Sequence, residues 1–297
     1  LQYDASAVYR LLFSHEGQKL VRLAFSGLVV WDLESGNENV RMKAGRGTGR
    51  ELVSAGFRED GTLLVGGHVD YQPTVWEADT ADVVWQGSKR PDAAGMAVMS
   101  PDAQFVVEFE AYGKGSQNTA RVYDLPTGEQ RFQLDTPPVK DHQCRVTVSP
   151  DARRILTLCL KGPVTRGLQP WTGQQAWSLA PVEQTWTGSV WDAETGKRQL
   201  EMHGASTLAT YAFSPDGRYL AIGEANGTVR LWSLEHREEL FGWRAWGERA
   251  KAPLMYSHLE FTPDSSALSV ADPSSSTLHV LQLTQVQSEL ADIGLDW

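Results

Sequence analysis

Residues 208–240 read LATYAFSPDGRYLAIGEANGTVRLWSLEHREEL and contain the clearest structural signal in the chain. Apolar and polar or small side chains alternate along 210–213 and again along 228–232, as they do in half-buried strands. Between these runs, Ser214-Pro-Asp-Gly217 is a turn sequence, because Pro fixes φ, Asp bonds to its own backbone and Gly accepts a positive φ. Asn226-Gly227 is a hairpin signal. The sequence predicts four antiparallel strands here, called a, b, c and d in chain order.

Weaker copies of this unit cover nearly the whole chain. The separations between the last residue of strand a and an anchor residue in strand c are 18 residues (13 to 31), 19 (57 to 76), 24 (99 to 123), 43 (148 to 191), 19 (213 to 232) and 19 (261 to 280). Four nearly identical separations are hard to obtain by chance. The repeat overrides the two-domain expectation that the length alone would give, and it predicts one all-β domain of six repeated units.

The quoted residues resemble a WD repeat, in which Phe-Ser-Pro-Asp-Gly is followed by Gly-Thr-Val-Arg-Leu-Trp. The resemblance extends over most of the chain and implies a β-propeller of four-stranded antiparallel blades. We expect a propeller domain over 1–283, with blades near 8–42, 52–86, 94–134, 144–202, 208–243 and 255–283. The recurring aromatic anchors in strand c are expected to be core residues: Trp31, Trp76, Tyr123, Trp191 and Trp232.

The chain departs from the family pattern at several positions. The Trp-Asp pair survives only at Trp31-Asp32 and Trp191-Asp192, and Asn226 replaces the Asp of the b–c turn. The Asp–His–Ser–Trp hydrogen-bond network of strong WD repeats therefore cannot form in the best blade. We expect divergent blades that are held together mainly by apolar packing between sheets.

The two ends of the chain bear on how the propeller closes. The last blade has no clear strand d, because 284–297 is predicted to be a helical tail. The N-terminal strand 1–4 is a candidate to complete that blade and remove its exposed edge. An alternative is a native propeller of seven blades. The tail also resembles a segment of large bacterial WD-repeat proteins, which predicts a fragment of a bacterial multidomain protein.

Composition and charge argue against several classes of function. The formal net charge is −10 and the isoelectric point is near 5.2, which argues against nucleic-acid binding. No run of 18 apolar residues is present, so no membrane span is predicted. Cys144 and Cys159 fall on strands a and b of the fourth blade. If Ser149 lies opposite Arg153, the two cysteines point to opposite faces of the sheet. We therefore expect reduced thiols and a cytoplasmic protein.

The longest connections suggest a binding surface. In an antiparallel blade the b–c and d–a connections leave the sheet at the same end. The segments 111–119, 161–188 and 243–254 are all connections of this kind, and 161–188 contains three Trp residues. Aromatic and basic side chains dominate binding energy at interfaces. The predicted partner-binding residues are Tyr112, Lys114, Arg166, Trp171, Trp177, Trp186 and Trp246. The alternatives are that these Trp side chains form a small core of their own or line a cofactor pocket.

The leading function is a non-enzymatic scaffold for a protein or peptide partner, with no catalytic residue, metal or cofactor. A propeller enzyme with a site built from loops is an alternative, although the chain has no Gly-x-Ser-x-Gly or His-Glu-x-x-His motif. A six-bladed periplasmic propeller of the TolB type is another, because its repeats also carry Ser-Pro-Asp-Gly. Fold alone selects none of these functions.

Overall fold

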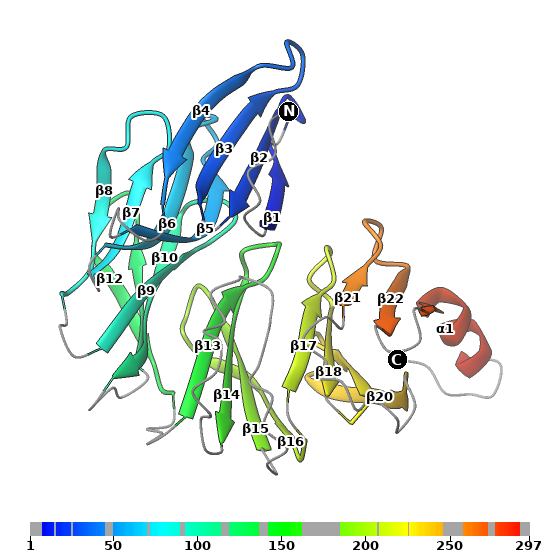
Figure 1. The fold of residues 1–297 in the computed structure, drawn as a ribbon. Helices are drawn as coiled ribbons and strands as arrows, with labels where there is room; N and C mark the ends of the chain where they lie inside the picture. Colours follow the sequence, from blue (N-terminus) through cyan, green and yellow to red (C-terminus); the bar gives the residue numbers. More distant parts are fainter. Residues whose placement is uncertain are drawn as a thin grey trace. The chain divides into compact units, whose positions relative to one another are not determined.

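The computed structural model consists almost entirely of β-strands (Figure 1). It describes residues 8–14, 16–24, 26–44, 50–69, 72–89, 93–113, 119–136, 142–161, 185–206, 208–224, 226–245, 258–272 and 277–291. The described strands form six antiparallel sheets in which every strand pairs with its neighbour in sequence. This arrangement confirms the predicted all-β class and is consistent with propeller blades. The chain divides into two compact units, with β1–β13 in unit 1 and β14–β23 and α1 in unit 2.

The first three sheets belong to unit 1. Sheet 1 is β1 (Val8–Phe13), β2 (Lys19–Ala24), β3 (Gly27–Asp32) and β4 (Glu38–Lys43). Sheet 2 is β5 (Arg50–Phe57), β6 (Leu63–Val69), β7 (Gln72–Glu77) and β8 (Val83–Gln86). Sheet 3 is β9 (Ala93–Met99), β10 (Phe105–Gly113), β11 (Ala120–Asp124) and β12 (Gln130–Leu134).

The remaining sheets follow in the same order. Sheet 4 is β13 (His142–Val148), β14 (Arg154–Lys161), β15 (Thr185–Asp192) and β16 (Arg198–Gly204). Sheet 5 is β17 (Leu208–Phe213), β18 (Tyr219–Glu224), β19 (Thr228–Ser233) and β20 (Glu238–Arg244). Sheet 6 has three strands, β21 (His258–Phe261), β22 (Ala267–Asp272) and β23 (Thr277–Gln282).

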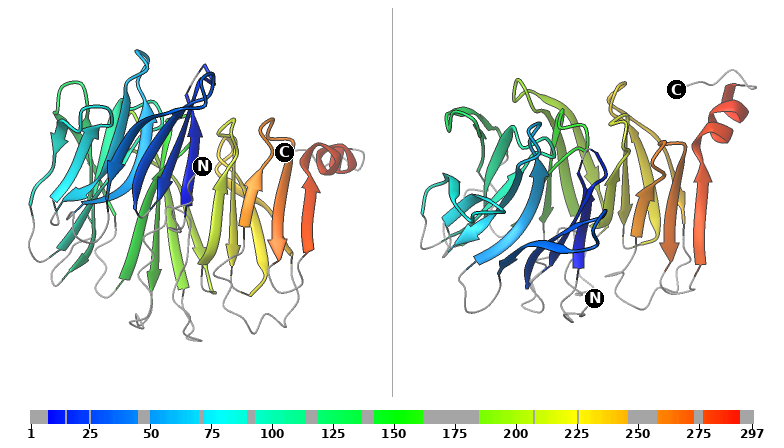
Figure 2. Two further views of the ribbon diagram at one scale, coloured as in Figure 1. Left: turned by 45° about the horizontal axis from the view of Figure 1, so that its top comes forward. Right: turned by 90° about the horizontal axis from the view of Figure 1, so that it is seen from above.

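After β23 the chain forms the helix α1 (Leu283–Ala291) instead of returning as a fourth strand (Figure 2). Leu283 is buried, and the Gln287 amide donates a hydrogen bond to the Tyr219 hydroxyl at 3.0 Å. The predicted helical tail 284–297 is thus a helix up to Ala291. The segment 1–4, predicted to complete this blade, lies outside the described residues.

The turns explain why the chain reverses where it does. The a–b turns place a residue with positive φ at the same point in all six sheets: Gly17, Gly61, Ala103, Ala152, Gly217 and Ser265. The c–d turns repeat this in the first five sheets, at Gly36, Ala81, Gly128, Gly196 and Arg237. Because side chains disfavour positive φ, five of these positions hold a residue under backbone strain.

Apolar packing joins consecutive sheets within each unit. In unit 1, Val21, Leu23 and Met42 of sheet 1 pack in one cluster with Phe57 and Trp76 of sheet 2. Unit 2 is built in the same way, with clusters that join sheets 4 and 5 and sheets 5 and 6. Three predicted anchors are confirmed as buried, namely Trp76, Trp191 and Trp232. Trp31 and Tyr123 are half-buried.

Buried polar contacts, which the sequence did not indicate, also join sheets 2 and 3. Glu108 of sheet 3 is buried and accepts hydrogen bonds from the Ser88 amide (3.0 Å) and the Tyr123 hydroxyl (3.1 Å). Arg121 lies 3.5 Å from the same carboxylate. The expectation of sheets held mainly by apolar packing is therefore incomplete, because a buried charge with several partners also fixes the junction between sheets 2 and 3.

The expectation of reduced thiols is wrong. Both cysteines are disulfide-bonded, and the sequence contains only these two. The Ser149 amide donates to the Arg154 carbonyl, so the turn is one residue longer than the sequence argument assumed. The cytoplasmic expectation, which rested on free thiols, loses this support.

Candidate functional site

The structure places Trp186, one of the predicted surface residues, in the core. The side chain is only 1% exposed and packs among the apolar residues between sheets 4 and 5. β15 begins at Thr185, and Trp186 pairs with Leu160 on β14 and with Gly204 on β16. The connection predicted over 161–188 is therefore shorter at its C-terminal end, and Trp186 is a core residue instead of a surface anchor.

A buried hydrogen bond fixes the Trp186 indole. Its Nε1 donates to Oε1 of Glu224 at 3.1 Å, and Glu224 is 1% exposed. The same carboxylate accepts from the Asn226 amide at 3.2 Å and lies 3.5 Å from Arg230. Gly204 leaves room for this contact, because a Cβ atom there would overlap both the indole and the carboxylate. Sequence reasoning missed this network, because its members lie on three strands and one turn of two sheets.

Tyr112 lies on the part of β10 that continues beyond the last residue paired with β11. β10 pairs with β11 only from Phe105 to Phe109, but it pairs with β9 up to Gly113. Tyr112 is paired with Ala94 in this two-stranded ribbon, beyond a register shift. The ribbon leads directly into the b–c connection of sheet 3. The other predicted residues, Lys114, Arg166, Trp171, Trp177 and Trp246, lie outside the described residues.

Two aromatic residues on β20 were not predicted as surface residues. Phe241 and Trp243 are half-buried, and their ring centroids are 5.5 Å apart. Both pack against the cluster between sheets 5 and 6 while keeping part of their surface in solvent. β20 ends at Arg244, two residues before Trp246. The alternation of Phe241 and Trp243 along the strand is the signal that could have identified them.

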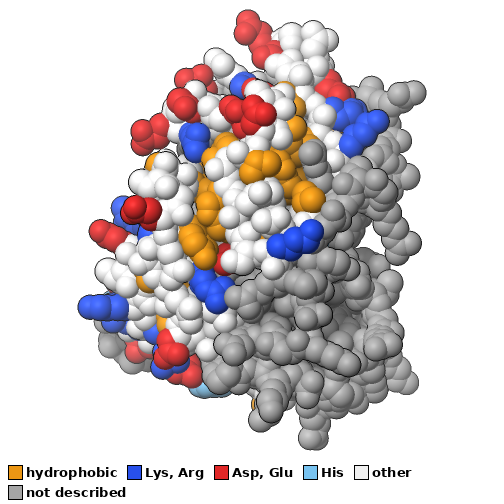
Figure 3. Space-filling model, turned by 90° about the vertical axis from the view of Figure 1, so that its left-hand side faces the viewer, with side chains coloured by type: hydrophobic (Ala, Val, Ile, Leu, Met, Phe, Trp, Pro, Cys, Tyr) orange, Lys and Arg blue, Asp and Glu red, His pale blue; other side chains and the backbone are white. Residues whose placement is uncertain are grey.

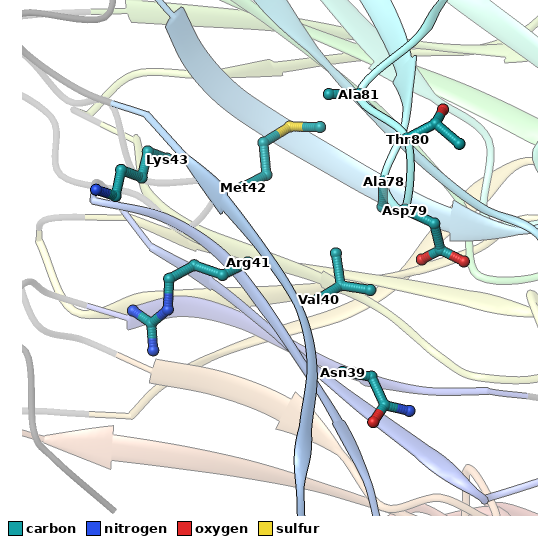
Figure 4. A pocket seen from close by; sticks show the side chains of 9 residues that line it. All are labelled: Asn39, Val40, Arg41, Met42, Lys43, Ala78, Asp79, Thr80 and Ala81. Carbon is teal, nitrogen blue, oxygen red and sulfur yellow. The ribbon is translucent and has the colours of Figure 1, made fainter.

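A groove in unit 1 lies beside β4 (Figure 4). Its volume is about 420 Å³, and Val40 and Met42 of β4 face Ala78 and Ala81 in the c–d turn of sheet 2. Asn39, Arg41, Lys43, Asp79 and Thr80 complete the lining. A second cavity of about 250 Å³ is lined by residues 26–29 and 41–44. Both cavities therefore flank the same outer strand.

The match to a known family covers the last strand of sheet 4, β16, and the first three strands of sheet 5. Residues 196–233 match the model described as WD domain, G-beta repeat. This match includes the Ser-Pro-Asp-Gly turn and the c strand with its buried Trp232, and the other sheets repeat the same strand order. This segment is therefore similar to a WD repeat, and the six sheets fit a WD-repeat propeller-like protein. No curated protein matches it. WD-repeat domains mediate protein interactions, so a scaffold role follows at this general level.

The lining of this groove combines apolar side chains with polar and charged ones. Arg41 forms an ion pair with Glu38 at 2.6 Å, and this hydrogen bond holds the pKa of Glu38 below its usual value. Among the residues that line the groove, Asp79 is the only acidic one, and none is His or Cys.

Charged and apolar side chains are mixed on the surface of unit 1. On the side where β8 and β12 lie, a band of hydrophobic side chains runs between acidic and basic ones (Figure 3). Within the part of the chain that the structure describes, no group of three His, Cys, Asp or Glu residues could hold a metal ion. None of the described helices is long and apolar enough to cross a membrane.

Proposed function

We propose that this protein is a non-enzymatic scaffold that binds a protein or peptide partner at its connection face. The connection face is defined as the sheet ends from which the b–c and d–a connections leave. Its anchors are Tyr112, Lys114, Arg166, Trp171, Trp177 and Trp246. Trp186 is excluded, because a side chain in the core cannot contact a partner.

The extended ribbon of sheet 3 is the observation that carries this proposal. A short turn is sufficient to connect two antiparallel strands. We therefore interpret the continuation of β10 beyond β11 as part of the binding surface. Here β10 remains paired with β9 as far as Gly113, and this pairing brings the backbone of Tyr112 to the connection face. A backbone that is already paired loses less conformational entropy on binding than a free loop does, which favours a binding role for this ribbon.

The aromatic pair on β20 supports the same assignment in sheet 5. Phe241 and Trp243 form a half-buried platform just before Trp246. Aromatic residues are enriched among the side chains that supply most interface energy. The d–a connection of sheet 5 thus begins from residues of the kind that a protein or peptide partner uses.

The test compares three forms of the full chain as baits in affinity capture from the cells that produce it. The first is the native chain, and the second carries Trp171→Ser and Trp177→Ser. The matched control is Leu33→Ser, because Leu33 is 43% exposed in a c–d turn, at the opposite sheet end. Each form is first checked by thermal melting.

A partner that is retained by the native chain and by Leu33→Ser, but lost by an equally stable double Ser variant, supports the connection face. Titration of the purified partner should then show a dissociation constant raised at least about tenfold, since hot-spot residues each contribute about 2 kcal/mol or more. Equal retention by all three baits would place the site elsewhere. Turnover of a substrate by the native chain would favour the enzyme alternative instead.

A further inference from the structure

The b–c turn of sheet 5 contains the one asparagine of the chain that precedes a glycine. The asparagines of the sequence are Asn37, Asn39, Asn118 and Asn226, and only Asn226 has glycine after it. Asn226 is exposed, and Gly227 has a φ of 90°. Because glycine has no Cβ atom, no side chain shields its backbone nitrogen from the residue before it. The turn therefore places an unshielded backbone nitrogen next to a side-chain amide.

We propose that Asn226 is a site of deamidation, in which water replaces the side-chain amide nitrogen, and that its hydrogen bonds limit the reaction to moments when the turn is open. The proposal is independent of where a partner binds, because it concerns the turn between β18 and β19 and the contacts of that turn alone.

Both reacting groups are held by hydrogen bonds in the closed turn. The Asn226 side-chain nitrogen donates to Oε2 of Glu224 at 3.2 Å, and its Oδ1 accepts from the Thr228 amide at 2.9 Å. The Gly227 amide, which is the nucleophile, donates to the Glu224 carbonyl at 3.0 Å. Attack requires this amide to lose its proton and to reach Cγ of Asn226, so these bonds must first break. Local opening of the turn supplies that state within the folded protein.

The reaction balances with water as its only co-reactant. The Gly227 nitrogen gives its proton to solvent and attacks Cγ of Asn226, and the bond from Cγ to the side-chain nitrogen breaks as ammonia leaves. The product is a cyclic imide. Water then opens the imide at either of its carbonyls, which gives aspartate or isoaspartate, the form in which the main chain runs through the side-chain carbons. No atom is oxidised or reduced.

The carboxylate that forms lies beside a buried one. Glu224 is 1% exposed, and its other oxygen, Oε1, accepts from the Trp186 indole at 3.1 Å. Deamidation removes a donor to Glu224 and puts a negative charge in its place, and like charges so close together repel. Arg230, which lies 3.5 Å from the Glu224 carboxylate, stays as a charged partner. The reaction therefore loosens the contact that restrains it and weakens the junction between sheets 4 and 5.

The first experiment measures the reaction in the full chain. The purified protein is incubated in mildly alkaline buffer, folded and in parallel unfolded in guanidinium chloride, and its peptides are analysed over time by mass spectrometry. We expect Asn226 to gain the mass of OH in place of NH2 in both forms, at least about tenfold faster in the unfolded one.

Asn37 is the internal control, because it is exposed but precedes Glu38, and it should convert more slowly than Asn226. Conversion of Asn37 as fast as Asn226, an unreactive Asn226 in the folded chain, or equal rates in the two forms would overturn the proposal.

The second experiment locates the opening that controls the rate. Trp186→Phe removes the donor to the other oxygen of Glu224, so the rate at Asn226 in the folded protein should rise about threefold. Trp76→Phe is the matched control, since Trp76 is equally buried but packs between sheets 1 and 2. The same rate in both variants would contradict control by this turn.

The third experiment measures what the product does to the fold. Asn226→Asp should melt about 2–6 °C below the native chain, whereas Asn37→Asp should differ from it by about 1 °C or less. A melting temperature of Asn226→Asp at or above that of the native chain would show that the new carboxylate does not weaken the contact with Glu224.

Discussion

The indole N–H of Trp186 on β15 donates a 3.1 Å hydrogen bond to the carboxylate of Glu224 on β18, and both side chains are buried. This bond joins sheet 4 to sheet 5 within unit 2. It also brings a buried carboxylate into contact with Trp186, a member of the apolar cluster that contains Leu158, Leu220 and Ile222. A buried charge is tolerated only when its partners remain in place.

Trp186→Phe should destabilise the fold by about 1–3 kcal/mol beyond the loss of ring volume, because Glu224 would lose a buried donor. Urea denaturation of both proteins gives the difference. Adding Glu224→Leu, which has no acceptor, to each background completes a double-mutant cycle. A coupling near zero between the two sites would show that the hydrogen bond contributes nothing.

Gly204→Ala should lower the stability of the fold more than a small surface substitution does, because the added Cβ would overlap the Trp186 indole and the Glu224 carboxylate. Overpacking of this kind costs about 1–3 kcal/mol or more. Gly242→Ala is the matched control, since the nearest atom to its Cβ would be 3.4 Å away. Melting temperatures of the two variants should differ by several degrees, and equal values would refute the steric explanation.

Arg237→Gly should stabilise the protein by about 1 kcal/mol. Arg237 is exposed and has a φ of 63°, a conformation that glycine adopts with less strain. The reverse change at the equivalent turn of sheet 1, Gly36→Ala, should cost a similar amount. Gly36 has a φ of 70°, and a Cβ added there would meet no atom within 4 Å, so only backbone strain changes. Chemical denaturation measures both, and opposite signs are required.

Asp264 in the a–b turn of sheet 6 should make stability depend on pH in acid. Hydrogen bonds from the Thr262 and Ser266 side chains lower the pKa of this carboxyl to about 2. Because the folded pKa is below the unfolded one, the stabilisation is fully present above about pH 4 and is lost as pH falls toward 2. Asp264→Asn should reduce the slope of stability against pH in this range.

The measurement that isolates this carboxyl is an NMR titration of the side chain. Thr262→Val removes one donor while keeping the shape of the side chain, so the pKa of Asp264 should rise toward its usual value. An unchanged titration curve in that variant would show that the hydrogen bond does not set the pKa.

Much of the fold could be predicted from sequence, because the signals are local. The Ser214–Gly217 turn depends on adjacent residues, and its Gly217 does adopt a positive φ of 70°. The anchors Trp76 and Trp191 recur at blade spacing and are buried as expected. Periodicity and turn chemistry within one sheet are therefore sufficient to identify the repeated units.

Features that depend on register or on a neighbouring sheet were not predictable in the same way. The sequence argument about the cysteines assumed a turn that is one residue too short, because the Ser149 amide bonds to the Arg154 carbonyl and alternation gave no warning of the longer turn. Trp186 was assigned to a connection because the continuation of β15 beyond its anchor leaves no local signal. Its partner Glu224 lies 38 residues away, so only the packing of two sheets brings them together.

The strictly sequential pairing of strands has a consequence for how the chain folds. Every described strand bonds to the one before or after it in sequence, so the sheets close short loops, except in sheet 4, where residues 162–184 separate β14 from β15. Loop-closure entropy is small for such contacts, and sheets of this kind form faster than those built from distant segments. Individual sheets can open and close as separate cooperative units. Amide hydrogen exchange should then show protection that falls in steps from sheet to sheet, with a lower step in three-stranded sheet 6 than in sheet 5.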